Sequence, residues 1–183
     1  MSDYGVITEA GSVRFERLLP GPIERVWDYL TDSEKRGKWL ATGRMELRIG
    51  GRVELHFVHA SLSPHREEVP EKYKAYGDGV TNYGCITQLR PPHLLAYTWG
   101  ETQREPGAPP DSEVTFELTP KGSEVLLVLT HRRLRDRGEM VSVSSGWHAH
   151  LGILADNLRG DTPRPFWSVH TKLESDYESR ISG

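Results

Sequence analysis

Residues 138–160 read GEMVSVSSGWHAHLGILADNLRG, and this stretch decides the fold class. Its apolar side chains fall within about 40° of one direction when successive residues are set about 100° apart, as on an α-helix. Gly160 suits the C-terminal cap of such a helix, and Pro163 and Pro165 prevent its continuation. We therefore predict one long helix whose apolar face packs on a sheet. The side chains on that face are Met140, Val143, Trp147, Leu151, Leu154 and Leu158.

The sequence before this helix alternates between apolar and polar residues in short runs that turns separate. Val53, Leu55 and Phe57 share one face of such a run, and Gly50-Gly51 precedes it as a turn. Alternation of this kind is typical of antiparallel strands with one buried face. It predicts strands near 13–18, 43–49, 52–59, 83–89, 94–99, 114–118 and 125–130.

Two short helices are predicted between the first two of these strands. Pro22 suits the first position of a helix. Thr31 and Glu34 have the spacing of a capping box, which starts a second helix that runs through Lys38. The first helix has one apolar face, made by Ile23, Val26, Trp27 and Leu30.

The remaining segments are two polar regions and a tail. Residues 60–78 and 101–111 are polar and rich in turn residues, and we expect both to be exposed loops. A final amphipathic helix is predicted from the apolar residues Phe166, Val169, Leu173, Tyr177 and Ile181. Its apolar face needs a cover, which is either the body of the same chain or a second copy, and we favour a homodimer. The chain then divides into an N-terminal arm (1–11), a main domain (12–160) and a tail helix (161–183).

Composition narrows the class of protein. The 183 residues carry a formal charge of -3, so no large positive field favours nucleic acid. No run of 18 apolar residues occurs, so we expect no membrane insertion. The single cysteine, Cys85, cannot form an internal disulfide. We expect a cytoplasmic protein.

Motifs for metal, nucleotide and nucleophilic chemistry are missing. His148 and His150 form an HxH pair, but on a helix they point about 200° apart, so joint chelation is poor and we expect no metal site. Neither the dinucleotide fingerprint nor the P-loop occurs in the sequence, and we expect no cofactor. Ser142, Ser144 and Ser145 lack the strand-to-helix elbow of a nucleophilic serine.

What remains is an aromatic surface between the sheet and the long helix. Such stripes usually fill a core, and that alternative stays open. His150 and Asn157 flank the apolar stripe on one side, where both could project a polar group into an apolar cavity. A structural histidine is the equal alternative. The other candidate ligand-binding residues are Phe57, Tyr83, Tyr97, Trp99 and Phe116 on the sheet, and Trp147, Leu151 and Leu154 on the helix.

Several stretches resemble the activator of Hsp90 ATPase branch of the START/polyketide-cyclase-like (SRPBCC) superfamily. They are PIERVWDYLTDSEKRGKWL, RIGGRVEL, ITQLRPPHLLAYTW, VLLVLTHRRL and SGWHAHLGIL, and the resemblance covers about residues 12–160. It implies an α+β helix-grip fold, in which a curved antiparallel sheet of about seven strands wraps around the C-terminal helix. It also implies a cavity for lipids, polyketides or other apolar molecules. No catalytic set of the superfamily can be placed on this sequence position by position.

Three functions follow from these observations. The leading hypothesis is that the cavity binds a small apolar or aromatic molecule. A second is a stress-response co-chaperone that acts with Hsp90. A third is a cyclase- or hydrolase-like enzyme with His150 as the candidate general base.

Overall fold

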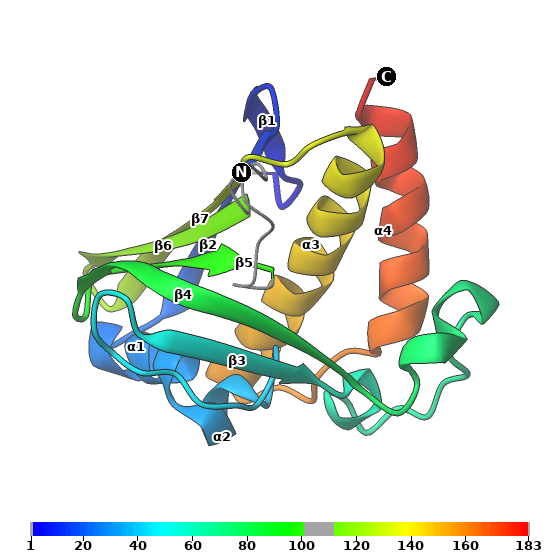
Figure 1. Ribbon diagram of the computed structural model, residues 1–183. Helices are drawn as coiled ribbons and strands as arrows, with labels where there is room; N and C mark the ends of the chain where they lie inside the picture. Colours follow the sequence, from blue (N-terminus) through cyan, green and yellow to red (C-terminus); the bar gives the residue numbers. More distant parts are fainter. Residues whose placement is uncertain (1, 101–111, 183) are drawn as a thin grey trace.

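The computed structural model describes residues 2–100 and 112–182 and contains one antiparallel sheet of seven strands (Figure 1). The strands are β1 (Val6–Glu9), β2 (Ser12–Pro20), β3 (Arg52–Phe57), β4 (Val80–Arg90), β5 (Leu94–Trp99), β6 (Ser112–Lys121) and β7 (Glu124–Arg132). The helices are α1 (Ile23–Thr31), α2 (Ser33–Arg36), α3 (Arg137–Arg159) and α4 (Phe166–Arg180), with short 3-10 turns η1 (His59–Ser61) and η2 (Glu71–Tyr76). The strand order across the sheet is β1-β2-β7-β6-β5-β4-β3.

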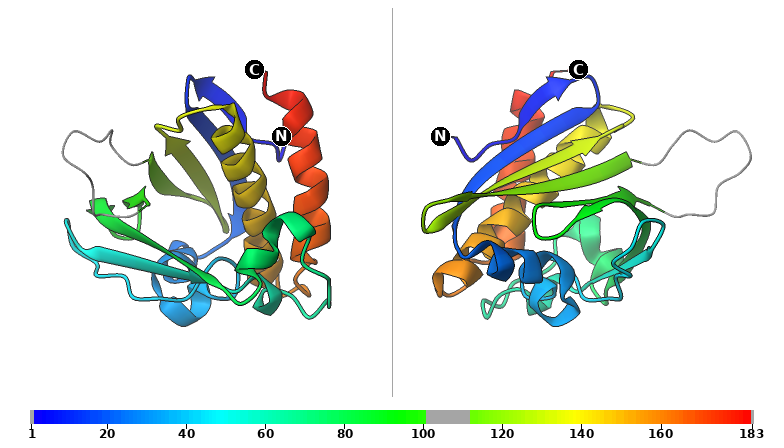
Figure 2. Two further views of the ribbon diagram at one scale, coloured as in Figure 1. Left: turned by 45° about the vertical axis from the view of Figure 1, so that its right-hand side comes forward. Right: turned by 90° about the vertical axis from the view of Figure 1, so that its left-hand side faces the viewer.

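The sheet curves around α3, and α4 lies on the other side of α3 (Figure 2). α3 begins at Asp136, whose side chain accepts a hydrogen bond from the amide of Glu139, and ends at Gly160 in a left-handed conformation. α1 and α2 close one end of the curved sheet (Figure 1). This is the helix-grip arrangement, and the predicted α+β fold class is confirmed.

Rows of apolar side chains cross the strands on the concave face and form the core. Phe15 of β2 lies opposite Leu129 of β7, which lies opposite Phe116 of β6, which in turn lies opposite Leu95 of β5. All four are at most 1 % exposed. The ring of Phe116 packs edge to face against Trp147 of α3, with centroids 5.7 Å apart. Cross-strand alignment of the alternating residues therefore provides the surface on which α3 packs.

The predicted strand over 43–49 is wrong. Residues 41–51 cross β3 at only two isolated bridges, Thr42 to His56 and Met45 to Val53. The segment is irregular because Gly43 has a φ of 129°, which lies outside the strand region. The buried guanidinium of Arg36 holds it in this form by donating hydrogen bonds to the carbonyl oxygens of Thr31, Ala41 and Gly43. The seventh strand is instead β1, within the segment expected to be an arm.

Residues 60–78 are mostly exposed, as expected, but they are not a free loop. They contain η1 and η2 and contact α4 through several side chains. The carboxylate of Glu67 accepts hydrogen bonds from the amides of Trp167 and Ser168, at 2.8 and 3.0 Å. Glu174 of α4 accepts hydrogen bonds from Lys72 and Tyr73. The segment therefore covers the N-terminal half of α4. The other predicted loop, 101–111, lies outside the described residues.

The tail helix packs on its own chain. Its apolar side chains are buried against α3 and neighbouring segments without a second copy. The hydroxyl of Tyr177 accepts a hydrogen bond from the amide of Gly5 over 2.8 Å and shares another with Nδ1 of His148 over 2.9 Å. Tyr4 donates to Asp176 over 2.6 Å. The apolar face of α4 therefore gives no reason to expect a dimer, contrary to the argument from sequence.

Candidate functional site

Two adjoining cavities of about 150 and 440 Å³ lie between β3, β4, α3 and α4. They share Phe57, Trp99, Ser142, Gly146 and His150, and we call them together the groove. Its other lining residues are Leu40, His59, Tyr73, Tyr76, Val80, Thr81, Asn82, Val143, Trp147, Phe166, Trp167 and His170. The larger cavity reaches solvent beside the exposed ring of Tyr76.

One wall of the groove is a stripe of successive turns of α3. Ser142, Gly146 and His150 are spaced one turn apart, so they lie on the same helix face. A Cβ atom on Gly146 would meet no atom within 4 Å, which shows that this glycine borders open space. Because two of the three residues are small, the helix leaves room between itself and the sheet.

His150 places a neutral imidazole at the bottom of this stripe. Its Nδ1 donates a hydrogen bond to the carbonyl oxygen of Trp39 over 2.8 Å, so Nε2 carries the free lone pair. Burial, with His59 nearby, lowers the pKa of His150 to about 3. Among the described residues Nε2 has no partner, and the atom is accessible from the groove. It is therefore a fixed hydrogen-bond acceptor that faces the cavity.

A buried polar chain holds Trp147 in place. Its indole Nε1 donates to Nδ1 of His131 over 2.9 Å. Nε2 of His131 must then carry the proton, and it donates to Oγ of Ser112 over 2.8 Å. Burial lowers the pKa of His131 to about 3, which keeps this ring neutral. The indole of Trp147 packs against Trp99, with ring centroids 5.1 Å apart. The aromatic wall of the groove is thus rigidly supported.

The opposite wall comes from η1 and α4. The ring of His59 stacks on Phe166 with centroids 4.5 Å apart and lies 5.7 Å from the ring of His150. Burial lowers the pKa of His59 to about 4 and also lowers the pKa of His170. Three buried nitrogens of this wall have no hydrogen-bond partner among the described residues: Nδ1 of His59, Nε1 of Trp167 and Nδ1 of His170. Each costs about 1–3 kcal/mol while unpaired.

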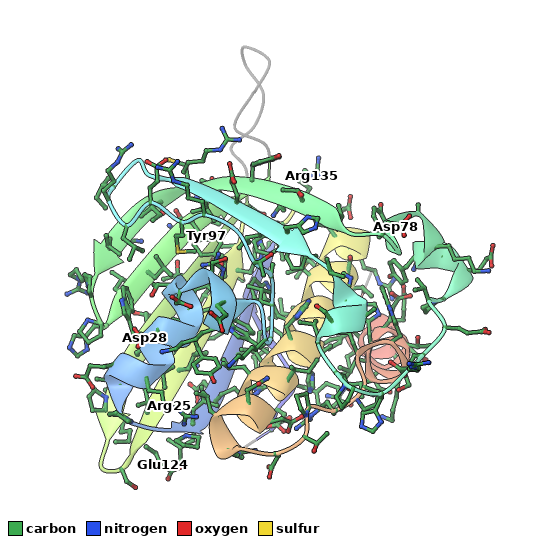
Figure 3. The ribbon with its side chains drawn as sticks, turned by 90° about the horizontal axis from the view of Figure 1, so that it is seen from below. Arg25, Asp28, Asp78, Tyr97, Glu124 and Arg135 are labelled. Carbon is green, nitrogen blue, oxygen red and sulfur yellow. The ribbon has the colours of Figure 1, made fainter. Side chains whose placement is uncertain are left out.

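The structure brings four of the ten predicted site residues together at the groove: Phe57, Trp99, Trp147 and His150. Four others, Tyr97, Phe116, Leu151 and Leu154, are at most 1 % exposed and belong to the filled core. In Figure 3 Tyr97 lies inside the molecule between the sheet and the end closed by α1 and α2. It stacks on Trp99 with centroids 6.4 Å apart, behind the groove.

Tyr83 and Asn157 lie away from the groove. Tyr83 pairs with Glu54 on the outer face of the sheet, where the guanidinium of Arg52 lies 4.9 Å from its ring centroid. The amide of Asn157 donates to the carbonyl oxygens of Lys38 and Ile153, so it ties α3 to the segment after α2. Tyr83 and Asn157 both have structural roles. The periodicity of the helix and of the strand does not predict these contacts.

Sequence reasoning missed the wall formed by His59, Phe166, Trp167 and His170. Phe166 and Trp167 are adjacent aromatic residues, but the sequence pattern places them in a tail helix that is expected to contact another copy. Only the fold brings it to the groove. No group of three or more His, Cys, Asp or Glu side chains within 2–100 and 112–182 is arranged to hold a metal ion. Within the same ranges, no helix is long and apolar enough to cross a membrane.

Comparison with solved structures identifies proteins of the same fold. The protein encoded by gene BPP1335 of Bordetella parapertussis is 46 % identical, with a TM-score of 0.81 over 100 % of this chain and 92 % of that one. CalU16 of Micromonospora echinospora is 22 % identical, with a TM-score of 0.65 over 98 % and 96 %. The Aha1 dimer of Colwellia psychrerythraea is 16 % identical, with a TM-score of 0.59 over 80 % and 95 %.

A family comparison agrees with these structural similarities. No curated protein matches the sequence. The sequence model of the activator of Hsp90 ATPase homolog 1-like proteins matches residues 20–159. This range runs from the end of β2 to the last residue of α3 and so includes most of the sheet and the helix that lines the groove. The chain therefore belongs to the family of activator of Hsp90 ATPase homolog 1-like proteins.

Proposed function

We propose that the protein binds a small, mainly apolar aromatic molecule in the groove. The observation that carries this proposal is the free Nε2 of buried His150 in an aromatic-lined cavity that borders Gly146. Small-molecule sites are typically concave and apolar, with a few fixed polar groups that orient the ligand. The larger cavity, at about 440 Å³, is within the usual size range of such sites.

The unpaired nitrogens of the α4 wall also support binding. Native proteins pair nearly all buried polar groups, so three unpaired ring nitrogens at one wall are unusual. They lie on residues that line the larger cavity. A small rearrangement of this wall around a ligand would let some of them form hydrogen bonds. Binding would then recover part of the free energy that their desolvation costs the free protein.

The geometry favours binding over catalysis by His150. A general base works best when its pKa is near the working pH, and burial holds the pKa of His150 at about 3. Its Nε2 is therefore a weak base, although it accepts hydrogen bonds well. The cyclase- or hydrolase-like alternative predicts that His150→Ala abolishes turnover of a bound carbonyl or ester while binding persists.

Family membership supports a second candidate, a co-chaperone that acts on Hsp90. This candidate predicts that the purified chain binds Hsp90 and stimulates its ATPase at micromolar concentrations. Absence of both effects would exclude it. Ligand binding and ATPase stimulation have separate readouts, so the two functions can be tested separately.

Isothermal titration of the purified chain with 2-naphthol, a compact aromatic probe, tests the proposed function. We expect saturable binding to one site, accompanied by a change in tryptophan fluorescence because Trp99 and Trp147 line the groove. Gly146→Leu should abolish binding, since its side chain would fill the groove. Gly138→Leu places the same substitution in the exposed first turn of α3 and should bind as the unmodified chain does.

The two variants also decide where the probe binds. Equal affinity in the Gly146→Leu and Gly138→Leu chains would show that the probe binds elsewhere. Naringenin and decanoate are tested in the same way. If neither of them binds and 2-naphthol does not bind either, the proposed function is wrong.

A further inference from the structure

No Lys, Arg, Asp or Glu lines the groove among the described residues. Next to its lining residue Tyr73, Lys72 pairs with Glu174 of α4, and the Nζ and Oε1 atoms are 2.8 Å apart. Tyr73 also donates to Glu174, so this carboxylate has two partners of its own. The part of the groove that residues 2–100 and 112–182 form therefore has no free formal charge that could pair with a charged ligand.

The imidazoles that line the groove do not supply a charge at neutral pH. Burial lowers the pKa of His59 to about 4 and that of His150 to about 3, and it lowers the pKa of His170 as well. A carboxylate that entered this space would lose its hydration without gaining a cation from the described residues, which is unfavourable. Fatty acids and other anions are poorly matched to such a site.

The polar atoms that the described residues offer to the groove are neutral, and three of them lie on the sheet and on α3. Nε2 of His150 can only accept a hydrogen bond, because Nδ1 carries the ring proton. The Ser142 hydroxyl lies two turns away on the same face of α3, and the Asn82 amide lies on β4. Neither side chain forms a hydrogen bond with another described residue. A ligand that bonds to His150 has to be the donor, and it can exchange further hydrogen bonds with Ser142 or Asn82.

We propose that the groove selects an uncharged aromatic molecule with a hydroxyl group that donates a hydrogen bond to Nε2 of His150. This inference rests on the proposed function and names the chemical class of its ligand. The aromatic walls made by Phe57, Trp99 and Trp147 contact the ring system, and His150 fixes its orientation. The class comprises phenols and hydroxylated polycyclic molecules.

Three probes with one ring system test this inference: 2-naphthol, 2-methoxynaphthalene and 2-naphthoate. Their affinities are measured by titration calorimetry near neutral pH, where the naphthol is uncharged and the naphthoate is an anion. We expect methylation of the hydroxyl to weaken binding about tenfold, the value of one well-placed hydrogen bond. We expect the naphthoate to bind at least about a hundredfold more weakly, because its carboxylate has no partner.

Variants of His150 connect the effect to this side chain. His150→Leu removes the acceptor, so 2-naphthol and 2-methoxynaphthalene should bind that chain with equal affinity. His150→Gln can donate to the Trp39 carbonyl and still present an oxygen to the groove, so it should restore part of the preference for the naphthol. In the unmodified chain, binding of 2-naphthol should also shift the ¹⁵N resonance of His150 Nε2.

The outcomes separate this inference from the proposed function. Equal binding of all three probes, or tighter binding of the naphthoate, overturns the ligand class while leaving an aromatic-binding groove. A preference for 2-naphthol that persists in His150→Leu overturns the role of His150. If His150→Leu does not fold, the comparison of the three probes on the unmodified chain still decides the ligand class. Failure of every probe to bind overturns the proposed function itself.

Discussion

His150 donates a hydrogen bond from Nδ1 to the carbonyl oxygen of Trp39, 2.8 Å away and 111 residues earlier in the chain. The contact joins the middle of α3 to the segment that follows α2. It also decides which imidazole nitrogen faces the groove. One bond therefore links the packing of the fold to the chemistry of the candidate site.

Loss of this bond should destabilise the protein. His150→Leu leaves the Trp39 carbonyl buried without that donor, and we expect the free energy of unfolding to fall by about 1–3 kcal/mol. His150→Gln, which keeps a donor, should lose less. Chemical denaturation followed by tryptophan fluorescence measures both effects. The control is His65→Leu, in an exposed position, which should change stability little. Equal losses for His150→Leu and His65→Leu would contradict the role of the bond.

Two glycines of α3 should respond to alanine in opposite ways. A Cβ atom on Gly146 enters open space, so Gly146→Ala should stabilise the protein by up to about 1 kcal/mol through helix propensity. A Cβ atom on Gly152 would lie 2.9 Å from the guanidinium of Arg164, which pairs with Asp156. We therefore expect Gly152→Ala to lower the thermal midpoint while Gly146→Ala raises it. A lower thermal midpoint for Gly146→Ala would show that the space beside Gly146 is filled, and a raised one for Gly152→Ala would show that Arg164 moves aside.

The buried histidines should make the protein sensitive to acid. Burial lowers the pKa of His131 and of His150 to about 3 in the folded protein. In the unfolded chain both bind protons near about pH 6.5, so the unfolded state takes up more protons as the pH falls and stability decreases. Between about pH 7 and about pH 5 we expect each histidine to remove about 2 kcal/mol from the free energy of unfolding.

A glutamine variant isolates the contribution of His131. In His131→Gln the amide can accept from Trp147 and donate to Ser112, but it does not titrate. Denaturation at a series of pH values should then show a slope that is shallower by up to about 1.4 kcal/mol per pH unit in the acid range. A slope identical to that of the unmodified chain would mean that His131 does not resist protonation in the fold.

Glu67 should stabilise the docking of α4. Its carboxylate accepts hydrogen bonds from the amides of Trp167 and Ser168 at the start of that helix. A negative charge there is also favourable for the helix dipole. Glu67→Gln should lower the free energy of unfolding by about 1 kcal/mol, measured by urea denaturation. Glu68→Gln makes the same change at the exposed neighbouring residue and should have little effect. A larger loss for Glu68→Gln would show that the helix is not capped in this way.

Elements whose signals are local can be predicted from the sequence alone. The apolar stripe of 138–160 and the glycine at 160 predicted α3 with its correct end, because helix periodicity and capping depend on neighbouring residues. Alternation likewise located most strands and therefore the α+β class. His150 was identified because its position beside the apolar stripe follows from the helix period alone.

Only the tertiary structure decided which side chains border open space. Whether a stripe residue such as Leu154 fills the core, or a neighbour such as Gly146 borders a cavity, depends on what lies opposite it. Tyr83 faces outward because the pairing of β4 with β3 sets its side, and a shift of one residue would reverse it.

The second wall of the groove depends on contacts between distant segments. Glu67 and Trp167 are 100 residues apart, and their contact brings α4 to the segment that carries His59. Local periodicity carries no information about such pairings, which arise when the chain buries the apolar face of α4 within itself. A cavity forms where facing side chains are too far apart to fill the space between them. Those distances are set only when all the helices and strands have packed together.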